Sequence, residues 1–369
     1  MTSVLLCGAF GQENPGDDAL LDAFLETLDR HELLVASPTT IGRSRAEVVA
    51  PTPLGVHRAL ARCDAVVIAG GTIFKTLHPS TGRHPLSLLA RTRMLLEGAR
   101  LRGIPFAAVG VGAGSLRSPT AKRLTRSIAE RADLLILRDE ESAAVLDATG
   151  AHGPFRIGAD PAWMLFDGRR AQATAARDGV VVAVSHLADD DTERLVERIS
   201  HVVEPLVVRG EPVELQPWQP GADQRVAVAI RDRLAHPAAV TVGSRPTTIH
   251  DAARRFATAR AVIGLRHHSL VAAAISGTPF LALSHEPKLA GLARRLGQPD
   301  VPVHAGRAVL ARAAVSVLDA DPADRAAVLG EIAAARRAMR LLRLVVCGGQ
   351  DDDLVDEDQL TLTAGGVPW

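Results

Sequence analysis

Apolar and polar positions follow two different periods along this chain. Short apolar runs that end at glycine, polar or basic residues are typical of parallel strands buried on both faces. Between these runs, apolar residues recur every three or four positions, as in Leu20, Leu21, Phe24, Leu25 and Leu28, which predicts amphipathic helices. Strand and helix therefore alternate, and the predicted fold class is α/β with doubly wound parallel sheets.

The alternation occurs twice, so that each half of the chain is expected to form one sheet. In the first half, strands are expected at residues 3–9, 33–36, 65–69, 106–110 and 134–137. In the second half, strands are expected at residues 180–185, 213–216, 240–242, 261–265 and 279–283. Helices are expected from Asp17 or Asp18, at 86–101, from Ser118, from 138–142, and at 191–203, 223–234, 247–258, 269–276, 307–318 and 322–342.

A polar stretch rich in alanine and arginine separates the two halves. We place a first domain at 1–166, a linker at 167–179, a second domain with C-terminal helices at 180–347, and an acidic, solvated tail at 348–369. Open α/β sheets bind ligands beyond the carboxyl ends of their strands. The prediction is therefore two Rossmann-like domains whose ligand-binding edges face one cleft.

The densest group of candidate binding residues lies in the second half. A buried strand is followed by Arg266, His267 and His268, then by a helix of small residues, and Lys288 comes just after the next strand. The first amides of a helix and its dipole favour anions, so these side chains are candidates for an anion site. The alternative is that the histidines cap the helix or lie on the surface, and that Arg266 forms a structural ion pair.

A glycine-rich loop follows the first strand and ends in Asn14, Pro15 and Gly16, with Asp17 and Asp18 next. The loop does not match the dinucleotide fingerprint G-x-G-x-x-G, and two carboxylates at the helix start would repel a pyrophosphate. One aspartate is expected to be the N-cap of the helix. The other is a candidate base for a hydroxyl group.

Two strands of the first half end in glycine, at Gly70 and Gly71 and at Gly110 and Gly112. Glycine at such places lets the backbone approach either a ligand or a neighbouring element closely. Both interpretations stay open.

Arg138 also follows a predicted strand, which makes it a further candidate for anion binding. The alternative for this residue is a surface ion pair with Asp139 or Glu141.

Composition narrows the function classes. The chain has 42 basic and 42 acidic residues among 369, so no global field favours nucleic acid or an anionic membrane as a partner. Cys7, Cys63 and Cys347 are odd in number and lack metal-like spacing, which favours a reducing cytoplasm. We expect no signal peptide, no transmembrane helix and, because the histidines are scattered, no metal site.

Seven motifs occur in order along the chain: Gly8, Gly11, Asn14, Gly16, Asp17, Asp18 and Ala19 near the start, then Gly70–Gly71, Gly110 with Gly112, Arg138–Asp139 with Ser142, Asp160–Pro161, Arg266 with His268, and the following helix with Gly277 and Pro279. Taken together, they resemble the pattern of the polysaccharide pyruvyl transferase family over roughly residues 4 to 290.

The resemblance implies two Rossmann-like domains arranged as in GT-B glycosyltransferases. It implies an enzyme that moves the pyruvyl group of phosphoenolpyruvate onto a sugar, forms a pyruvate ketal across two hydroxyls and releases phosphate. The family's functional acid, arginine and histidine correspond to Asp17, Arg138 and His268. Asn14, Asp18 and Gly71 lie inside matching motifs and are expected to bind substrate; phosphoenolpyruvate is a donor substrate, and no cofactor is expected.

The chemistry of such a transfer suits these residues. Guanidinium groups match carboxylate and phosphate, so Arg138 and Arg266 are assigned to the donor, with Lys288 and His267 in support. Protonation of the methylene carbon needs an acid that titrates near neutrality, for which His268 is the candidate. Asp17 would accept the proton of the attacking hydroxyl.

One departure from the family pattern concerns the acceptor. Before Pro287 and Lys288, many relatives carry an aromatic residue, whereas this chain has His285 and Glu286. A polysaccharide acceptor is therefore not assumed, and a smaller glycoside, a lipid-linked sugar or a specialised metabolite stays open. The sequence also leaves open the ketal stereochemistry and whether the protein is a homo-oligomer.

Other functions compete with this interpretation. A GT-B glycosyltransferase that uses a nucleotide sugar would need the same basic edge to hold a diphosphate. A family member without catalysis would act as a binding component. NAD-dependent chemistry is disfavoured because the dinucleotide fingerprint is missing.

Overall fold

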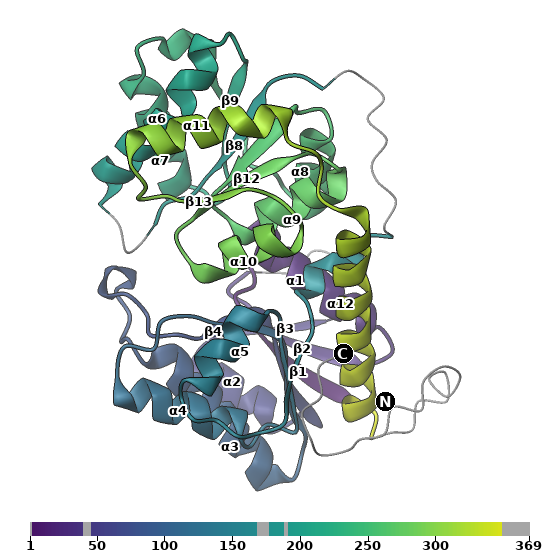
Figure 1. Ribbon diagram of the computed structural model, residues 1–369. Helices are drawn as coiled ribbons and strands as arrows, with labels where there is room; N and C mark the ends of the chain where they lie inside the picture. The colour runs from purple at the N-terminus through teal and green to yellow at the C-terminus, as the bar shows by residue number, and fades with distance from the viewer. Residues whose placement is uncertain (1, 40–45, 168–176, 188–190, 349–369) are drawn as a thin grey trace. The chain divides into compact units, whose positions relative to one another are not determined.

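The computed structural model describes residues 2–39, 46–167, 177–187 and 191–348. The chain forms two compact units (Figure 1). Of the described residues, 2–12, 17–39, 46–165 and 331–348 form the first unit, and 13–16, 166–167, 177–187 and 191–330 form the second.

The first unit contains a parallel sheet that, in the described residues, has seven strands in the order β3-β2-β1-β4-β5-β6-β7. The strands are β1 (Ser3–Cys7), β2 (Glu32–Ala36), β3 (Glu47–Val49), β4 (Ala65–Phe74), β5 (Phe106–Ala113), β6 (Leu134–Leu137) and β7 (Phe155–Ile157). The helices are α1 (Pro15–Thr27), α2 (Pro53–Leu60), α3 (Ser87–Arg102), α4 (Pro119–Ala129) and α5 (Glu140–Asp147), with 3-10 turns η1 (Pro79–Thr81) and η2 (Pro161–Leu165).

The second unit repeats this order with six strands in its described part, β10-β9-β8-β11-β12-β13, again all parallel. The strands are β8 (Val180–Val184), β9 (Val213–Pro217), β10 (Val240–Val242), β11 (Ala261–Gly264), β12 (Phe280–Ser284) and β13 (Asp300–Pro302). The helices are α6 (Thr192–Val208), α7 (Ala222–Arg233), α8 (Ile249–Phe256), α9 (His267–Ser276), α10 (Pro287–Arg295) and α11 (Arg307–Ser316), with η3 (Pro237–Ala239) and η4 (Val317–Asp319).

Both sheets have the strand order of Rossmann folds, in which the direction of winding reverses beside the first strand. The reversal lies between β1 and β4 in the first unit and between β8 and β11 in the second. Two doubly wound parallel sheets were predicted, and this prediction is confirmed.

The elements that the apolar pattern missed are short. Strands β3, β7 and β13 have three residues each, too few to show a period. Helix α2 did carry a local start signal, because Thr52 precedes Pro53 and its side chain accepts the Gly55 N–H.

The last long helix, α12 (Arg325–Val346), shows a limit of the predicted domain boundaries. The sequence placed the C-terminal helices to residue 347 in the second domain, but the chain from Glu331 onward groups with the first unit. The buried side of this helix packs on the first unit, which explains the assignment. Its Ala338 Cβ lies 3.4 Å from the position that a Cβ would take on Gly158, a residue of the first unit. Helical periodicity shows which face is buried but not against which sheet.

The predicted linker and tail fall largely on residues outside the described ranges, at 168–176 and 349–369. The described end of the linker belongs to the second unit. Arg177 donates from Nη1 to Gly277 O (2.7 Å) and from Nη2 to Ser276 O (3.3 Å). A guanidinium at these carbonyls stabilises the negative end of α9.

Gly110 interrupts the pairing of β5 with β6, where the register shifts between Val109 and Val111. Its φ is +65°, and a Cβ there would lie 2.2 Å from Pro161 Cδ, whereas Gly150 has a φ of +72° with nothing within 4 Å of a Cβ. A left-handed conformation costs a residue with a Cβ about 1–2 kcal/mol, and overpacking adds about 1–3 kcal/mol.

We expect Gly110→Ala to lower the free energy of unfolding by about 3 kcal/mol and Gly150→Ala by about 1 kcal/mol. Urea unfolding of the two variants beside the wild-type protein measures both values. Equal losses would contradict the packing role of Gly110.

Cys7 lies at the buried end of β1, and burial raises the pKa of its thiol from 9.0 to about 11, although Arg91 opposes the shift. The neutral thiol is thus favoured in the folded protein. Its contribution to stability is full below pH 9 and is lost as pH rises through about 11. The chain has no tyrosine, so few other groups titrate in this window.

We expect the free energy of unfolding of the wild-type protein to fall between pH 9 and 11, with a slope of up to about 1.4 kcal/mol per pH unit from this thiol. Cys7→Ala should show a shallower fall, whatever its stability at neutral pH. Parallel curves for the two proteins would show that the Cys7 thiol does not titrate in this way.

Candidate functional site

In the first unit, polar side chains from neighbouring strand ends gather around the guanidinium of Arg138, which follows β6 and is 4% exposed. Its Nε donates to Asp139 Oδ2 (2.9 Å) and its Nη2 to Thr72 Oγ1 (3.1 Å). Its Nη1 lies 3.7 Å from Asp160 Oδ2. The surface ion pair considered for Arg138 is thus a buried one, with two carboxylates rather than one.

Asp139 also begins helix α5. Its Oδ1 accepts the Ser142 N–H (2.7 Å) as an N-cap and a short hydrogen bond from Ser142 Oγ. Ser142 Oγ in turn accepts the Ala113 N–H (2.8 Å) at the end of β5. One carboxylate therefore fixes the helix start, the end of β5 and the plane of the Arg138 guanidinium.

The glycines of the first unit separate the two interpretations that the sequence left open. A Cβ on Gly112 would stand 2.7 Å from Arg138 Nη2, so Gly112 makes room for the guanidinium as Gly110 does for Pro161. Gly71 differs, because its φ is +75° and nothing lies within 4 Å of a Cβ there. Packing explains Gly110 and Gly112, and Gly71 stays a candidate for close approach of a ligand.

The glycine-rich loop after β1 differs in one detail from its prediction. Helix α1 begins at Pro15 rather than at Asp17 or Asp18, and Asn14 Oδ1 accepts the Gly16 N–H (3.1 Å) in the manner of an N-cap. The expectation that an aspartate caps this helix is therefore wrong. Asp18 instead accepts the Gly11 N–H (3.3 Å), which ties the loop to the first helical turn.

Asp17 is half-buried in that same first turn. Just before it, Glu13 has a φ of +53° and is the one non-glycine residue with positive φ in the described chain. Such strained conformations cluster in functional loops.

In the second unit, Arg266 stands at the N-cap position of α9, and His267 and His268 are its first two residues. The helix thus starts two residues earlier than predicted. All ten residues of α9 are buried, and the two imidazole rings meet edge to face with centroids 5.4 Å apart. The side chain of the N-cap residue Arg266 makes no capping hydrogen bond, and the positive end of the helix coincides with the basic triplet.

Arg266 is held by a residue that the sequence analysis did not single out. Its Nη2 donates to Asp223 Oδ2 (2.7 Å) and to Gln219 Oε1 (2.8 Å), and its Nε donates to Asp223 Oδ2 (3.2 Å). Asp223 is fully buried and also accepts the His186 N–H (2.7 Å) after β8. The structural ion pair considered for Arg266 therefore exists, and it fixes the direction of a guanidinium that keeps 19% of its side chain exposed.

Asp223 had a local signal in the sequence, since it lies in the first turn of α7, just after Pro220 and Gly221. An aspartate there is ordinarily a helix-start residue. Asp223 follows β9 and Arg266 follows β11. These two strands lie on either side of β8 in the folded sheet, so only the fold brings the two side chains together.

Lys288 is the second residue of α10, directly after β12, and β12 neighbours β11. It therefore lies at the same edge of the sheet as Arg266, as the sequence predicted, and its ammonium contacts the Glu286 carboxylate. His285, in place of the usual aromatic residue, is exposed.

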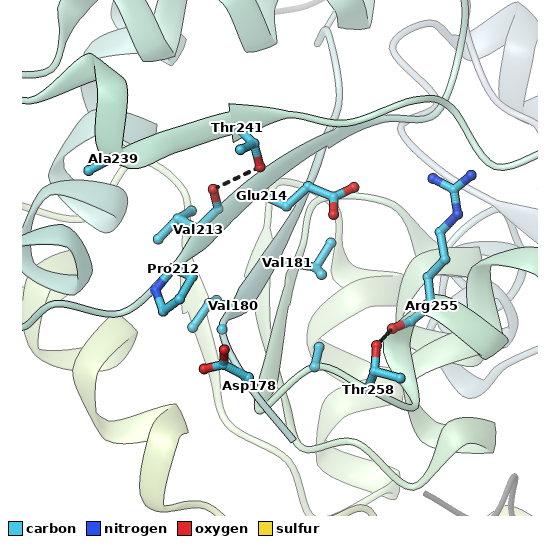
Figure 2. Close-up of a pocket in the computed structure, with 12 residues that line it drawn as sticks. Asp178, Val180, Val181, Pro212, Val213, Glu214, Ala239, Thr241, Arg255 and Thr258 are labelled. Carbon is cyan, nitrogen blue, oxygen red and sulfur yellow. Dashed lines mark hydrogen bonds between the residues drawn. The ribbon is translucent and has the colours of Figure 1, made fainter. Parts of the chain in front are cut away.

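The second unit also has a cavity of about 320 Å³ at the opposite edge of the sheet (Figure 2). Its lining includes Val180 and Val213, the first residues of β8 and β9. Asp178 and Glu214 contribute carboxylates there, and Arg255 donates to Ser244 O (2.8 Å). This cavity is unsuited to an anionic ligand and is not part of the candidate site.

The sequence model of the polysaccharide pyruvyl transferase family matches residues 14–287. This range covers most of the chain and includes every candidate residue except Lys288.

Solved structures of similar fold have low sequence identity. The UDP-GlcNAc 2-epimerase of Methanocaldococcus jannaschii, in complex with UDP-GlcNAc and UDP, is 11% identical at a TM-score of 0.66, over 94% of this chain and 100% of that one. The UDP-GlcNAc 2-epimerase of Neisseria meningitidis, bound to UDP-GlcNAc, is 11% identical at a TM-score of 0.60, over 93% and 100%. Alr3699/HepE of Anabaena, in complex with UDP, is 14% identical at a TM-score of 0.57, over 94% and 100%. These likenesses concern the fold alone and confirm the predicted GT-B-like class.

Two arginines of the first unit that contact carboxylates differ sharply in burial. Arg138 and its carboxylate partners Asp139 and Asp160 are buried, whereas Arg62 and Glu47 are 57% and 50% exposed. Removing one partner of a buried pair leaves a charge out of water and costs about 3–5 kcal/mol, whereas exposed pairs contribute little.

We expect Arg138→Met to lower the free energy of unfolding by about 3–5 kcal/mol, with part of the loss recovered in Arg138→Met/Asp139→Asn. The matched change Arg62→Met should leave stability nearly unchanged. Urea unfolding of the three variants checks this, and similar losses for Arg138→Met and Arg62→Met would contradict the buried network.

Proposed function

The chain belongs to the polysaccharide pyruvyl transferase family, and we propose that it transfers the pyruvyl group of phosphoenolpyruvate to hydroxyls of a sugar-containing acceptor. The observation that carries the proposal is the basic triplet Arg266, His267 and His268 at the start of a buried helix, inside the range that the family matches.

The donor would bind in the second unit. Phosphoenolpyruvate carries a carboxylate and a phosphate, and the start of α9 offers helix amides together with the oriented guanidinium of Arg266. Lys288 at the same edge supplies a second cation. Arg138 has its Nε and Nη2 already bonded, so we assign it to hold the strand ends around the substrate rather than to neutralise the donor.

His268 is proposed as the acid. It is the second residue of α9, at the helix start where the donor would bind. His267, which packs edge to face on it, would keep the ring in place.

The reaction balances with these groups. His268 gives a proton to the methylene carbon, an acceptor hydroxyl attacks the adjacent carbon, and Asp17 takes the hydroxyl proton. The carbon–oxygen bond to phosphate then breaks, phosphate leaves with the proton held by Asp17 as hydrogen phosphate, and a second hydroxyl adds while its proton returns to His268. The product is a cyclic pyruvate ketal, in which the former methylene carbon is a methyl group.

We expect millimolar phosphoenolpyruvate to raise the unfolding midpoint, because a ligand at about 100 times its Kd adds about 2.7 kcal/mol. The shift should disappear in Arg266→Gln/Asp223→Asn, in which no buried carboxylate is orphaned, and persist in Arg233→Gln, which removes an exposed arginine of the same unit. Inorganic phosphate at the same concentration separates donor binding from generic anion binding.

His268→Gln should keep the thermal shift but lose at least about a hundredfold in phosphate release with an active acceptor, the scale of general acid catalysis. His236→Gln, which changes an exposed histidine, should retain activity. Full turnover in His268→Gln would exclude His268 as the acid.

A second candidate is an enzyme that acts on a nucleotide sugar. It is favoured by the structural neighbours whose crystals contain UDP or UDP-GlcNAc. Stabilisation by UDP-GlcNAc with no shift from phosphoenolpyruvate would favour this function over pyruvyl transfer.

A further inference from the structure

The zero net charge of the chain hides one strongly basic segment. Residues 65–129, from β4 to the end of α4, contain ten lysines and arginines but a single acidic residue, Glu97. All of this segment lies in the first unit. A protein with no net charge can therefore have one face with a positive electrostatic field.

Seven of these ten basic side chains are exposed, on two adjacent helices and the loops before them. Helices α3 and α4 pack against each other (Figure 1), and their inner sides belong to the core beneath the first sheet. The exposed basic residues of this region are Arg83, Arg100, Arg102, Arg117, Lys122, Arg123 and Arg126.

Few carboxylates neutralise this face. Glu97 is shared by Arg93 and Arg131, and Arg126 pairs with Glu130 (3.6 Å). Within the described ranges, Arg100 and Lys122 have no carboxylate at ion-pair distance. Desolvation lowers the pKa of the Arg93 guanidinium, and the positive charges of Arg131 and Arg100 lower it further, as expected where cations are crowded.

Helix α3 also carries exposed large apolar side chains. Met94 is 48% exposed and Leu101 is 88% exposed, and their spacing of seven residues puts them on one side of α3. The opposite side of that helix is already used, since Leu89, Leu95 and Leu96 are in the core. Helix α3 thus has one apolar side in the core and a second, exposed apolar side. Arginines flank the exposed side.

This combination selects one kind of partner. Single-stranded nucleic acid is bound by basic grooves with exposed aromatic rings, but the aromatic residues of this segment, Phe74 and Phe106, are fully buried. Basic side chains around exposed aliphatic ones suit the headgroup region of an anionic bilayer. No helix of the described chain is long and apolar enough to cross a bilayer, so contact would be at the surface.

We propose that the α3–α4 face docks on the surface of an anionic lipid bilayer, with Leu101 and Met94 inserted among headgroups that Arg100, Lys122 and Arg123 contact. Under the proposed function, an acceptor sugar anchored in the same bilayer is the substrate class that this docking would serve. The docking itself needs neither donor nor acceptor.

The test is co-sedimentation of the full chain with vesicles of phosphatidylglycerol and phosphatidylcholine, and with phosphatidylcholine alone. We expect binding to the anionic vesicles only, lost at about 0.5 M salt because exposed charges are then screened. The variant Arg100→Gln/Lys122→Gln/Arg123→Gln should weaken binding on the order of a hundredfold, about fivefold for each cation near the surface. Leu101→Ser should weaken it about tenfold by removing apolar insertion.

Matched controls lie in the second unit: Arg225→Gln/Arg233→Gln removes exposed arginines, and Val208→Ser removes an apolar side chain that is 75% exposed. Both should bind as the wild-type protein does. The proposal is overturned if the controls and the α3–α4 variants lose binding equally, or if anionic vesicles are not bound. It is also overturned if the triple variant instead loses binding to a labelled RNA or abolishes a dimer, since the face would then serve nucleic acid or a second copy.

Discussion

A guanidinium that is taken out of water at the end of a parallel strand must be matched by carboxylates, and both units are built around this constraint. Arg138 is stable in its buried place only because Asp139 and Asp160 lie beside it, and Arg266 is oriented by the fully buried Asp223. Breaking such a pair exposes an uncompensated charge to a low dielectric. The carboxylates therefore determine where each arginine can be, and with it the shape of the strand-end loops.

The same constraint explains why several motifs occur together. Gly112 leaves the space that the Arg138 guanidinium fills, and Gly110 leaves the space for Pro161, which follows Asp160. Asp139 caps α5 while it pairs with Arg138. Motifs far apart in sequence thus form one packed cluster. Their presence together indicates a common architecture more strongly than it indicates contact with a ligand. Gly71, which has open space beside it, is the exception.

The sequence predicted most of the fold because alternating strands and helices leave local periods in the apolar pattern. It could not predict that the chain from Glu331 onward joins the first unit, because helical periodicity does not show which sheet the buried side of a helix packs on. For the site, it found Arg266, His267 and His268, which are adjacent in sequence, but not Asp223, whose contact with Arg266 spans 43 positions. It also assigned the cap of α1 to an aspartate, although Asn14 stands one turn earlier; proline at the first helical position was the overlooked signal.

Net charge leaves the distribution of charge over the surface open, because a sum carries no information on position. Lys and Arg equal Asp and Glu over the whole chain, which argues against a global field. The field near a surface depends on charges within about a Debye length, roughly 8 Å at physiological salt. Glu97 is the sole acidic residue between Ala65 and Ala129, so the acidic residues that balance the total lie elsewhere in sequence. A local cationic face is therefore compatible with a neutral protein, and the apolar side of α3 determines which anionic partner such a face suits.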